Sequence, residues 1–170
     1  MKFIFKNNNP QPQEKEIPLI WEKNEPKIIK NIYQITGLKL KTNKIICTID
    51  NSTSHGLYGY KNITLGIKGG ITKDDILMVI THELFHIFYW GKIRKIKLSK
   101  GFLGKETKKE WELAEITAFF ITSEPKLKKF WPNAKVYLYP ETKELYKKVK
   151  RFWKKKDFEY FLKNSYKQVK

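Results

Sequence analysis

The 170-residue chain is expected to fold as one small α+β domain. Three observations indicate this class. Residues 44–50 are short and β-branched, and residues 62–67 alternate between apolar and smaller or polar side chains; both patterns are typical of strands. Residues 72–90 are apolar on nearly all sides, as in a central buried helix. Residues 107–122 carry a capping signal followed by an amphipathic helical pattern.

The N-terminal segments are expected to support the fold rather than to carry chemistry. Residues 2–6 could form a short strand. Isoleucines at helical spacing predict a packing helix over 25–37, with Pro26 in its first turn and a glycine at its end. Residues 44–50 predict a buried strand, in which Cys47, the only cysteine, is a small buried hydrophobic side chain.

The next segments are expected to form a strand and the long helix that follows it. Residues 62–67 predict a half-exposed strand at the edge of the sheet. Thr72 with Asp75 three residues later resembles a capping box, so a helix is expected to begin there. The helix is expected to run to about Trp90 and to end at Gly91.

The C-terminal half is expected to contain further helices. A basic loop leads to Thr107, which with Glu110 forms a second capping signal for a helix that ends before Pro125. Basic helices are predicted over 126–131 and 141–168, and the segment between them, at 136–139, reads equally as strand or loop. We expect residues 1–125 to form the main module, with its core at 25–125, and residues 126–170 to extend the same domain.

The net charge of +18 is concentrated in two segments. Residues 91–109 contain eight basic and one acidic side chain, and residues 126–170 contain fifteen and four. These segments could attract nucleic acid or an acidic partner. A solvated lysine-rich surface is an equally good explanation of the same pattern.

The sequence also suggests where the protein works. One cysteine excludes an internal disulfide and a multi-cysteine zinc ribbon. No apolar run resembles a signal peptide, and the longest one, 76–90, is too short and too polar to span a membrane. We therefore expect a cytoplasmic protein that does not bind membranes and is a monomer.

The motif His82-Glu83-Leu84-Phe85-His86 predicts a metal site. Histidines four residues apart lie on the same face of a helix and can share one ion. Glu83 is turned by about 100° from His82, so it is placed to act on a metal-bound water as a general base. If these polar groups were buried without a metal or another partner, desolvation of each would cost roughly several kcal/mol of folding free energy.

A third zinc ligand is expected from the downstream helix. No histidine follows His86, and no aspartate lies between Asp75 and Asp157. Glu112 and Glu115 are the remaining acids on a well-patterned helix. We favour Glu115, because it lies in the middle of the helix beside small alanines, and keep Glu112 as the second choice.

The residues around the motif resemble a known group. Residues 80–88, the sequence Glu115-Ile116-Thr117-Ala118-Phe119-Phe120 and then Pro125 are similar to the gluzincin zinc metallopeptidases, most of all to the ImmA/IrrE-type family, and the layout is similar to that of minigluzincins. The resemblance covers about residues 56–125. It implies a zincin-like fold, one Zn²⁺ held by His82, His86 and Glu115, and Glu83 as the base.

The resemblance also implies where a substrate binds. Zincin edge strands bind a peptide by strand addition, which assigns this role to Asn62, Ile63, Thr64 and Leu65. His55, in the loop before the strands, could contact substrate or stabilise the oxyanion. Tyr137 and Tyr139 are further candidates for the oxyanion.

Together these observations predict a zinc-dependent metalloendopeptidase that acts on a peptide or protein substrate. The alternative is a catalytically idle zincin-fold module that binds nucleic acid or a protein partner through its basic loop and C-terminal helices. Those helices could also cover the active site, or simply complete the fold.

Overall fold

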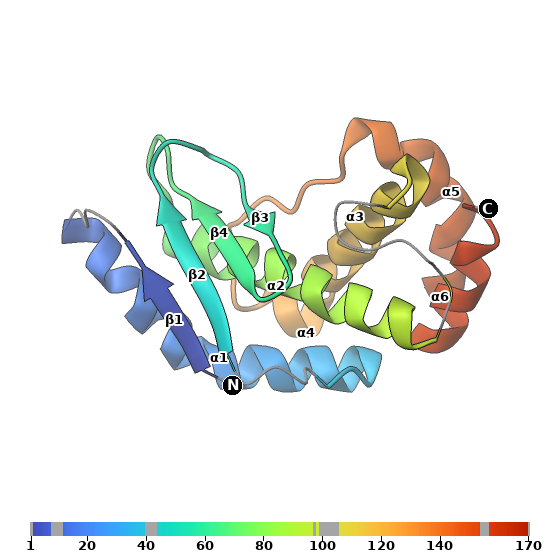
Figure 1. Cartoon of the computed structure of the whole chain (residues 1–170), viewed down its shortest axis with the longest axis horizontal. Helices are drawn as coiled ribbons and strands as arrows, with labels where there is room; N and C mark the ends of the chain where they lie inside the picture. The colour runs from blue at the N-terminus through green and yellow to red at the C-terminus, as the bar shows by residue number, and fades with distance from the viewer. Residues whose placement is uncertain are drawn as a thin grey trace.

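The computed structural model describes residues 2–7, 12–39, 44–96, 98, 106–153 and 157–169. The protein is a mixed α+β fold in which helices outweigh a small sheet (Figure 1). The predicted basic segment 91–109 is described only in part, since residues 97 and 99–105 lie outside the described residues.

The sheet contains both parallel and antiparallel pairs. Its strands are β1 (Lys2–Lys6), β2 (Lys44–Asp50), β3 (Leu57–Tyr58) and β4 (Asn62–Gly66), in the order β1-β2-β4-β3. The β1–β2 and β2–β4 pairs are parallel, and β3 runs antiparallel to β4. The strands predicted at 2–6 and 44–50 are confirmed. Cys47 is buried on β2 and has a free thiol, as expected.

The prediction that residues 62–67 form an exposed edge strand is wrong. β4 lies between β2 and β3, which pairs with Ile63 and Thr64. At the other end of β4, a β-carbon on Gly66 would overlap with the backbone of His55. The edge of the sheet on this side is therefore β3, a strand too short for its two residues to be recognised by alternation.

Helix α1 (Glu16–Thr36) starts nine residues before the predicted position, so Pro26 lies inside it rather than in its first turn. A proline at such a site costs about 3 kcal/mol of helix stability. One stripe of the helix is buried throughout: Ile17, Trp21, Ile28 and Ile32. Each buried side chain of this size contributes about 1.5–3 kcal/mol, so packing outweighs the proline. The predicted end holds, because Gly37 adopts φ 67° and caps the helix.

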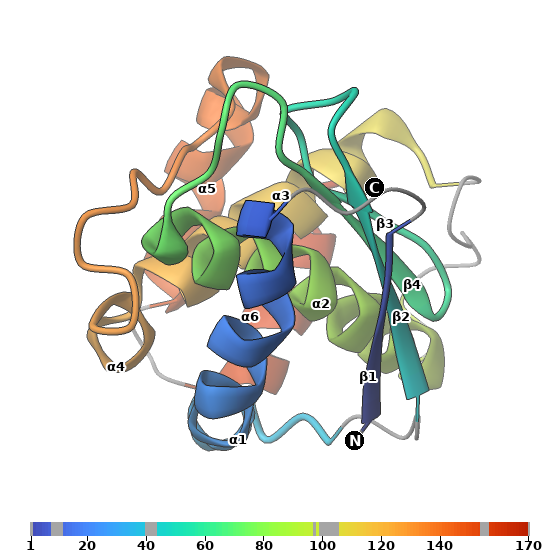
Figure 2. The ribbon, with the colours of Figure 1, turned by 90° about the vertical axis from the view of Figure 1, so that its left-hand side faces the viewer.

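Helix α2 (Lys73–Lys95) begins as predicted, with the Thr72 hydroxyl accepting a hydrogen bond from the Asp75 N–H. It does not end at Gly91 but continues for another turn, in which Ile93 is fully buried. Burial of this turn compensates for a helical glycine, which is worse than alanine by about 1 kcal/mol. Figure 2 shows α1 and α2 on the same face of the sheet.

Helix α3 (Lys108–Ser123) packs against α2 and has the predicted capping box. The Thr107 N–H donates to the Glu110 carboxylate and the Glu110 N–H donates to the Thr107 hydroxyl. Both bonds satisfy N–H groups that the first turn leaves without intrahelical partners.

The remaining elements are short: η1 (Pro12–Lys15), α4 (Pro125–Lys128), η2 (Pro140–Thr142), α5 (Lys143–Trp153) and α6 (Phe158–Tyr166). The predicted helix at 126–131 is thus only one turn, residues 136–139 are a loop, and the predicted 141–168 helix is divided into three pieces. Trp131, Val149 and Phe161 are buried in the same apolar core as α2 and α3. None of the described helices has the length and apolarity needed to cross a membrane.

Candidate metal centre

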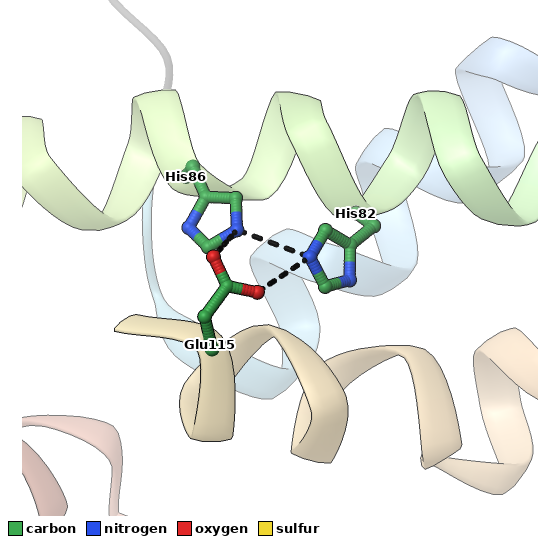
Figure 3. A group of neighbouring side chains, drawn as sticks. All are labelled: His82, His86 and Glu115. Atoms are coloured by element: carbon green, nitrogen blue, oxygen red, sulfur yellow. Dashed lines mark hydrogen bonds and ion pairs between the residues drawn. The ribbon is translucent and has the colours of Figure 1, made fainter. Parts of the chain in front are cut away.

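Three polar side chains meet between α2 and α3 (Figure 3). His82 and His86 lie four residues apart on α2, so both imidazoles point to the same side of that helix. Glu115 lies in the middle of α3 and points toward them. Ala114 and Ala118 beside it are fully buried, which permits a close approach of the two helices.

The possible ligand atoms of the three side chains lie close together. Nε2 of His82 lies 3.1 Å from Oε2 of Glu115, and Nε2 of His86 lies 3.3 Å from Oε1. The two Nε2 atoms are 3.1 Å apart. Within the described part of the chain, this is the one group of three histidine, cysteine or acidic side chains that could share a metal ion.

The spacing of these atoms is compatible with zinc. Two ligand atoms of a tetrahedral site with bonds of about 2.0–2.1 Å are about 3.3 Å apart. The observed contacts, in which each imidazole faces a different oxygen of Glu115, are 3.1 to 3.3 Å and so close to that value. Two imidazoles and a carboxylate are also a usual donor set for zinc, and three protein ligands leave one position for water or substrate. These residues could therefore hold a zinc ion.

The ring of His86 is held by a neighbouring tyrosine. Ligand histidines usually donate their other ring N–H to an acceptor. The buried Nδ1 of His86 has no such acceptor among the described residues. Its ring is instead held by Tyr58 on β3, which stacks on it with centroids 4.2 Å apart and planes 19° apart. Tyr58 is in turn fixed by Trp90, whose Nε1 donates to its hydroxyl at 3.2 Å.

The charges of the site support an ionised carboxylate ligand. Burial alone would raise the pKa of Glu115, but His86 and His82 outweigh it and hold that pKa well below its usual range. Burial likewise opposes the charged form of His82, yet the hydrogen bond to Glu115 and the nearby carboxylates raise its pKa. Glu115 is therefore a charged acceptor, the form in which a carboxylate binds a metal.

Glu83 occupies the space between α2 and the start of β3. It is buried, and burial raises its pKa, although the two imidazoles partly oppose this. A β-carbon on Gly56 would overlap with the Glu83 side chain. Glycine at position 56 thus leaves the room that this carboxylate occupies beside the ligand cluster.

The other predicted site residues lie at different distances from the cluster. Glu112 is partly buried one turn before Glu115 and does not belong to the group of potential ligands. His55 is exposed in the loop before β3, and in the described part of the chain no hydrogen bond or ion pair joins its imidazole to the cluster. Residues 62–65 belong to the interior strand β4. Because β3 pairs with Ile63 and Thr64, a substrate peptide could not add directly alongside them.

Tyr139, one of the two tyrosines suggested for the oxyanion, packs beside Trp111, one helical turn before Glu115 on α3. Burial and the charges of Glu115 and Glu83 raise its pKa to about 12. Its phenol therefore remains protonated at neutral pH and can donate a hydrogen bond. Its ring lies 5.9 Å from that of Trp111 on α3 and 5.5 Å from that of Tyr137.

The sequence interpretation missed Gly56, Tyr58 and Trp90 as parts of the site. Trp90 follows His86 by four residues, so the helical spacing that identified the ligands could have pointed to it. Nothing local in the sequence places Gly56 or Tyr58 against α2. Comparisons of the chain with models of known families, with curated proteins and with solved structures give no match. The function is therefore inferred from the geometry of the site.

Proposed function

We propose that the protein is a zinc-dependent metallopeptidase of the gluzincin type. One observation carries this proposal: two imidazoles and a carboxylate converge, with contacts of 3.1 to 3.3 Å between them, and the buried carboxylate of Glu83 lies beside them. A metal site with a purely structural role would need only the three ligands. A hydrolytic site also needs a base that does not bind the metal, and the residue after His82 supplies it.

The residues divide the chemistry between them. When bound, zinc would lower the pKa of a water molecule and polarise the scissile carbonyl. His82, His86 and Glu115 would hold the ion through their Nε2 and carboxylate oxygen atoms. Glu83 takes the proton from the attacking water and passes it to the leaving amide nitrogen.

Tyr139 is the proposed donor to the oxyanion. Its hydroxyl is protonated at neutral pH, since its pKa is raised to about 12. It lies near enough to Glu115 and Glu83 for their charges to act on it. A donor aimed at the carbonyl oxygen stabilises the charge that develops there, an effect of about 10²–10³ in rate.

The edge strand for substrate binding is β3 rather than β4. β3 pairs with β4 on one side only among the described strands. Gly56, just before β3, lies against Glu83, and Tyr58 within it stacks on His86. A peptide could add to its other side by backbone hydrogen bonds. Asn62 to Leu65 then support β3 instead of contacting substrate.

Two exposed tyrosines lie in the loop that packs beside α3. Tyr137 and Tyr139 are 52% and 37% exposed, and the ring of Tyr139 lies 5.9 Å from that of Trp111, one helical turn before Glu115. We infer that the substrate presents an apolar or aromatic side chain next to the scissile bond.

Cleavage of a quenched fluorescent peptide library tests the proposal. Glu83→Gln should lower kcat/KM by about 10²–10⁴ and leave the zinc content unchanged, because the ligands are intact. Glu112→Gln is the matched control and should retain both. Full activity in Glu83→Gln, or cleavage that persists after the metal has been removed by a chelator, would overturn it.

A further inference from the structure

The face of α2 opposite to the metal site lines a groove on the surface. A groove of about 460 Å³ lies between the end of α1 and the C-terminal half of α2. Successive helical residues are turned by about 100°, so Ile87, Gly91 and Lys95 point away from the side that carries His82 and His86. We call this hollow the basic groove.

Four cationic side chains surround the basic groove: Lys39, Lys92, Arg94 and Lys95. None of the described residues that line it is acidic. Lys92 is paired with Glu159 at 2.6 Å, but no ion pair of the described residues involves Lys39 or Lys95. Another cavity, near Trp153, is lined by Glu124 and Asp157 as well as by a lysine, so one sign of charge is not a general feature of this surface. The groove is therefore suited to a ligand with several negative charges.

The floor of the groove is apolar, and at Gly91 no side chain covers the helix backbone. Leu38, Ile87 and Phe88 form the apolar part. A β-carbon on Gly91 would meet nothing within 4 Å, so the fold itself does not require a glycine there. A glycine inside a helix lowers its stability, and one without a steric reason is expected where another chain approaches the backbone closely.

We propose that the basic groove binds an acidic peptide segment of a protein partner, with one aliphatic side chain seated over Gly91. Glutamate or aspartate side chains of the segment pair with the basic rim, while the aliphatic side chain covers Ile87. This is the arrangement by which amphipathic segments dock into grooves. Nucleic acid is a poorer fit, because Phe88 is 4% exposed and offers no ring face for a base.

Fluorescence anisotropy of three labelled probes tests this proposal. The probes are a helical peptide with leucine on one face and glutamate elsewhere, poly-glutamate, and a single-stranded oligonucleotide of equal net charge. The protein carries Glu83→Gln, so that the peptide is not cleaved. We expect the leucine-containing peptide to bind most tightly, and its affinity to fall as salt is added.

Two groove variants and one control locate the site. Gly91→Leu places a side chain over the floor, where its β-carbon meets nothing within 4 Å, and should weaken peptide binding by about tenfold or more, with a thermal midpoint that is unchanged or higher. Lys39→Glu with Lys95→Glu should do the same by reversing the charge of the rim. Lys143→Glu with Lys148→Glu, exposed lysines on α5, should change the affinity less than about twofold. Peptide binding that Gly91→Leu leaves intact, no binding at all, or preferential binding of the oligonucleotide would overturn the proposal.

Discussion

The two faces of α2 are constructed in opposite ways. On one face the polar side chains are enclosed: His86 is fully buried, stacked on Tyr58 and in contact with Glu115. On the other, Gly91 leaves the backbone open and Lys95 is exposed. The difference is that buried polar groups require fixed partners, whereas an exposed cation is stabilised by water.

This contrast assigns different sensitivities to the two faces. A small displacement on the enclosed face moves a reacting group and should change the rate of cleavage. On the open face, an exposed residue can be substituted without loss of packing. Such a substitution should leave the activity constant and change only the stability or the binding of a partner. The following substitutions test that division, beginning with the largest effect.

Among these substitutions, Tyr139→Phe should have the largest effect. Loss of the hydroxyl removes the proposed hydrogen bond to the oxyanion, and kcat should fall by about 10²–10³. Tyr137→Phe, in the same loop and more exposed, should leave kcat within about twofold, the range of surface substitutions. Steady-state kinetics on a peptide substrate measures both. Equal rates for the two variants would remove Tyr139 from the mechanism.

The glycines of the two faces form a matched pair. Neither Gly56 nor Gly91 has positive φ, so alanine is compatible with both backbones. In Gly56→Ala the new methyl group must displace the Glu83 carboxylate, and kcat/KM should fall by about 10². In Gly91→Ala the activity should be unchanged and the free energy of unfolding should rise by about 0.5–1 kcal/mol. Similar kinetics in both variants would contradict the division between the faces.

Tyr58→Leu should weaken zinc binding by about tenfold, because it removes the ring that holds the His86 imidazole in place. Competition with a chromogenic chelator measures the affinity. Tyr60→Leu serves as the control, since Tyr60 is 54% exposed and its ring faces Lys61 and Arg94. If both variants bind zinc like the wild type, the stacked ring does not position the ligand.

Glu159→Gln should have the smallest effect. Lys92 and Lys163 lower the pKa of Glu159 to about 2, from about 4.3 in an unfolded chain. Its contribution to stability is therefore complete above about pH 5 and is lost as the pH falls toward 2. Because the carboxylate is largely solvated, the variant should lose only about 0.5 kcal/mol at pH 7 and less at pH 3. Urea unfolding at both pH values checks this, and a larger difference at pH 3 would contradict the assignment.

The elements that carry the ligands were predictable because their signals are local. The spacing of His82 and His86 and the capping bonds of Thr72 and Thr107 each lie within one or two helical turns. The choice of Glu115 over Glu112 followed from its central position on a helix with small neighbours. The structure brings Glu115 to both histidines.

The errors share a different cause. The early start of α1 and the continuation of α2 through Gly91 depend on burial against other elements, which outweighs local helix propensity. The two-residue strand β3 exists only through its pairing with β4. Gly56 and Tyr58 therefore gain their positions beside α2 from the register of the sheet, which the sequence pattern does not specify.

The zinc content of purified protein tests the central claim most directly. Wild type, Glu115→Gln and Glu112→Gln would be loaded with zinc, dialysed and measured by atomic emission, with circular dichroism to verify that each is folded. We expect one zinc ion per chain in the wild type and in Glu112→Gln, and a large loss in Glu115→Gln. Zinc retained by Glu115→Gln and lost from Glu112→Gln, or no zinc in the folded wild type, would contradict the site described here.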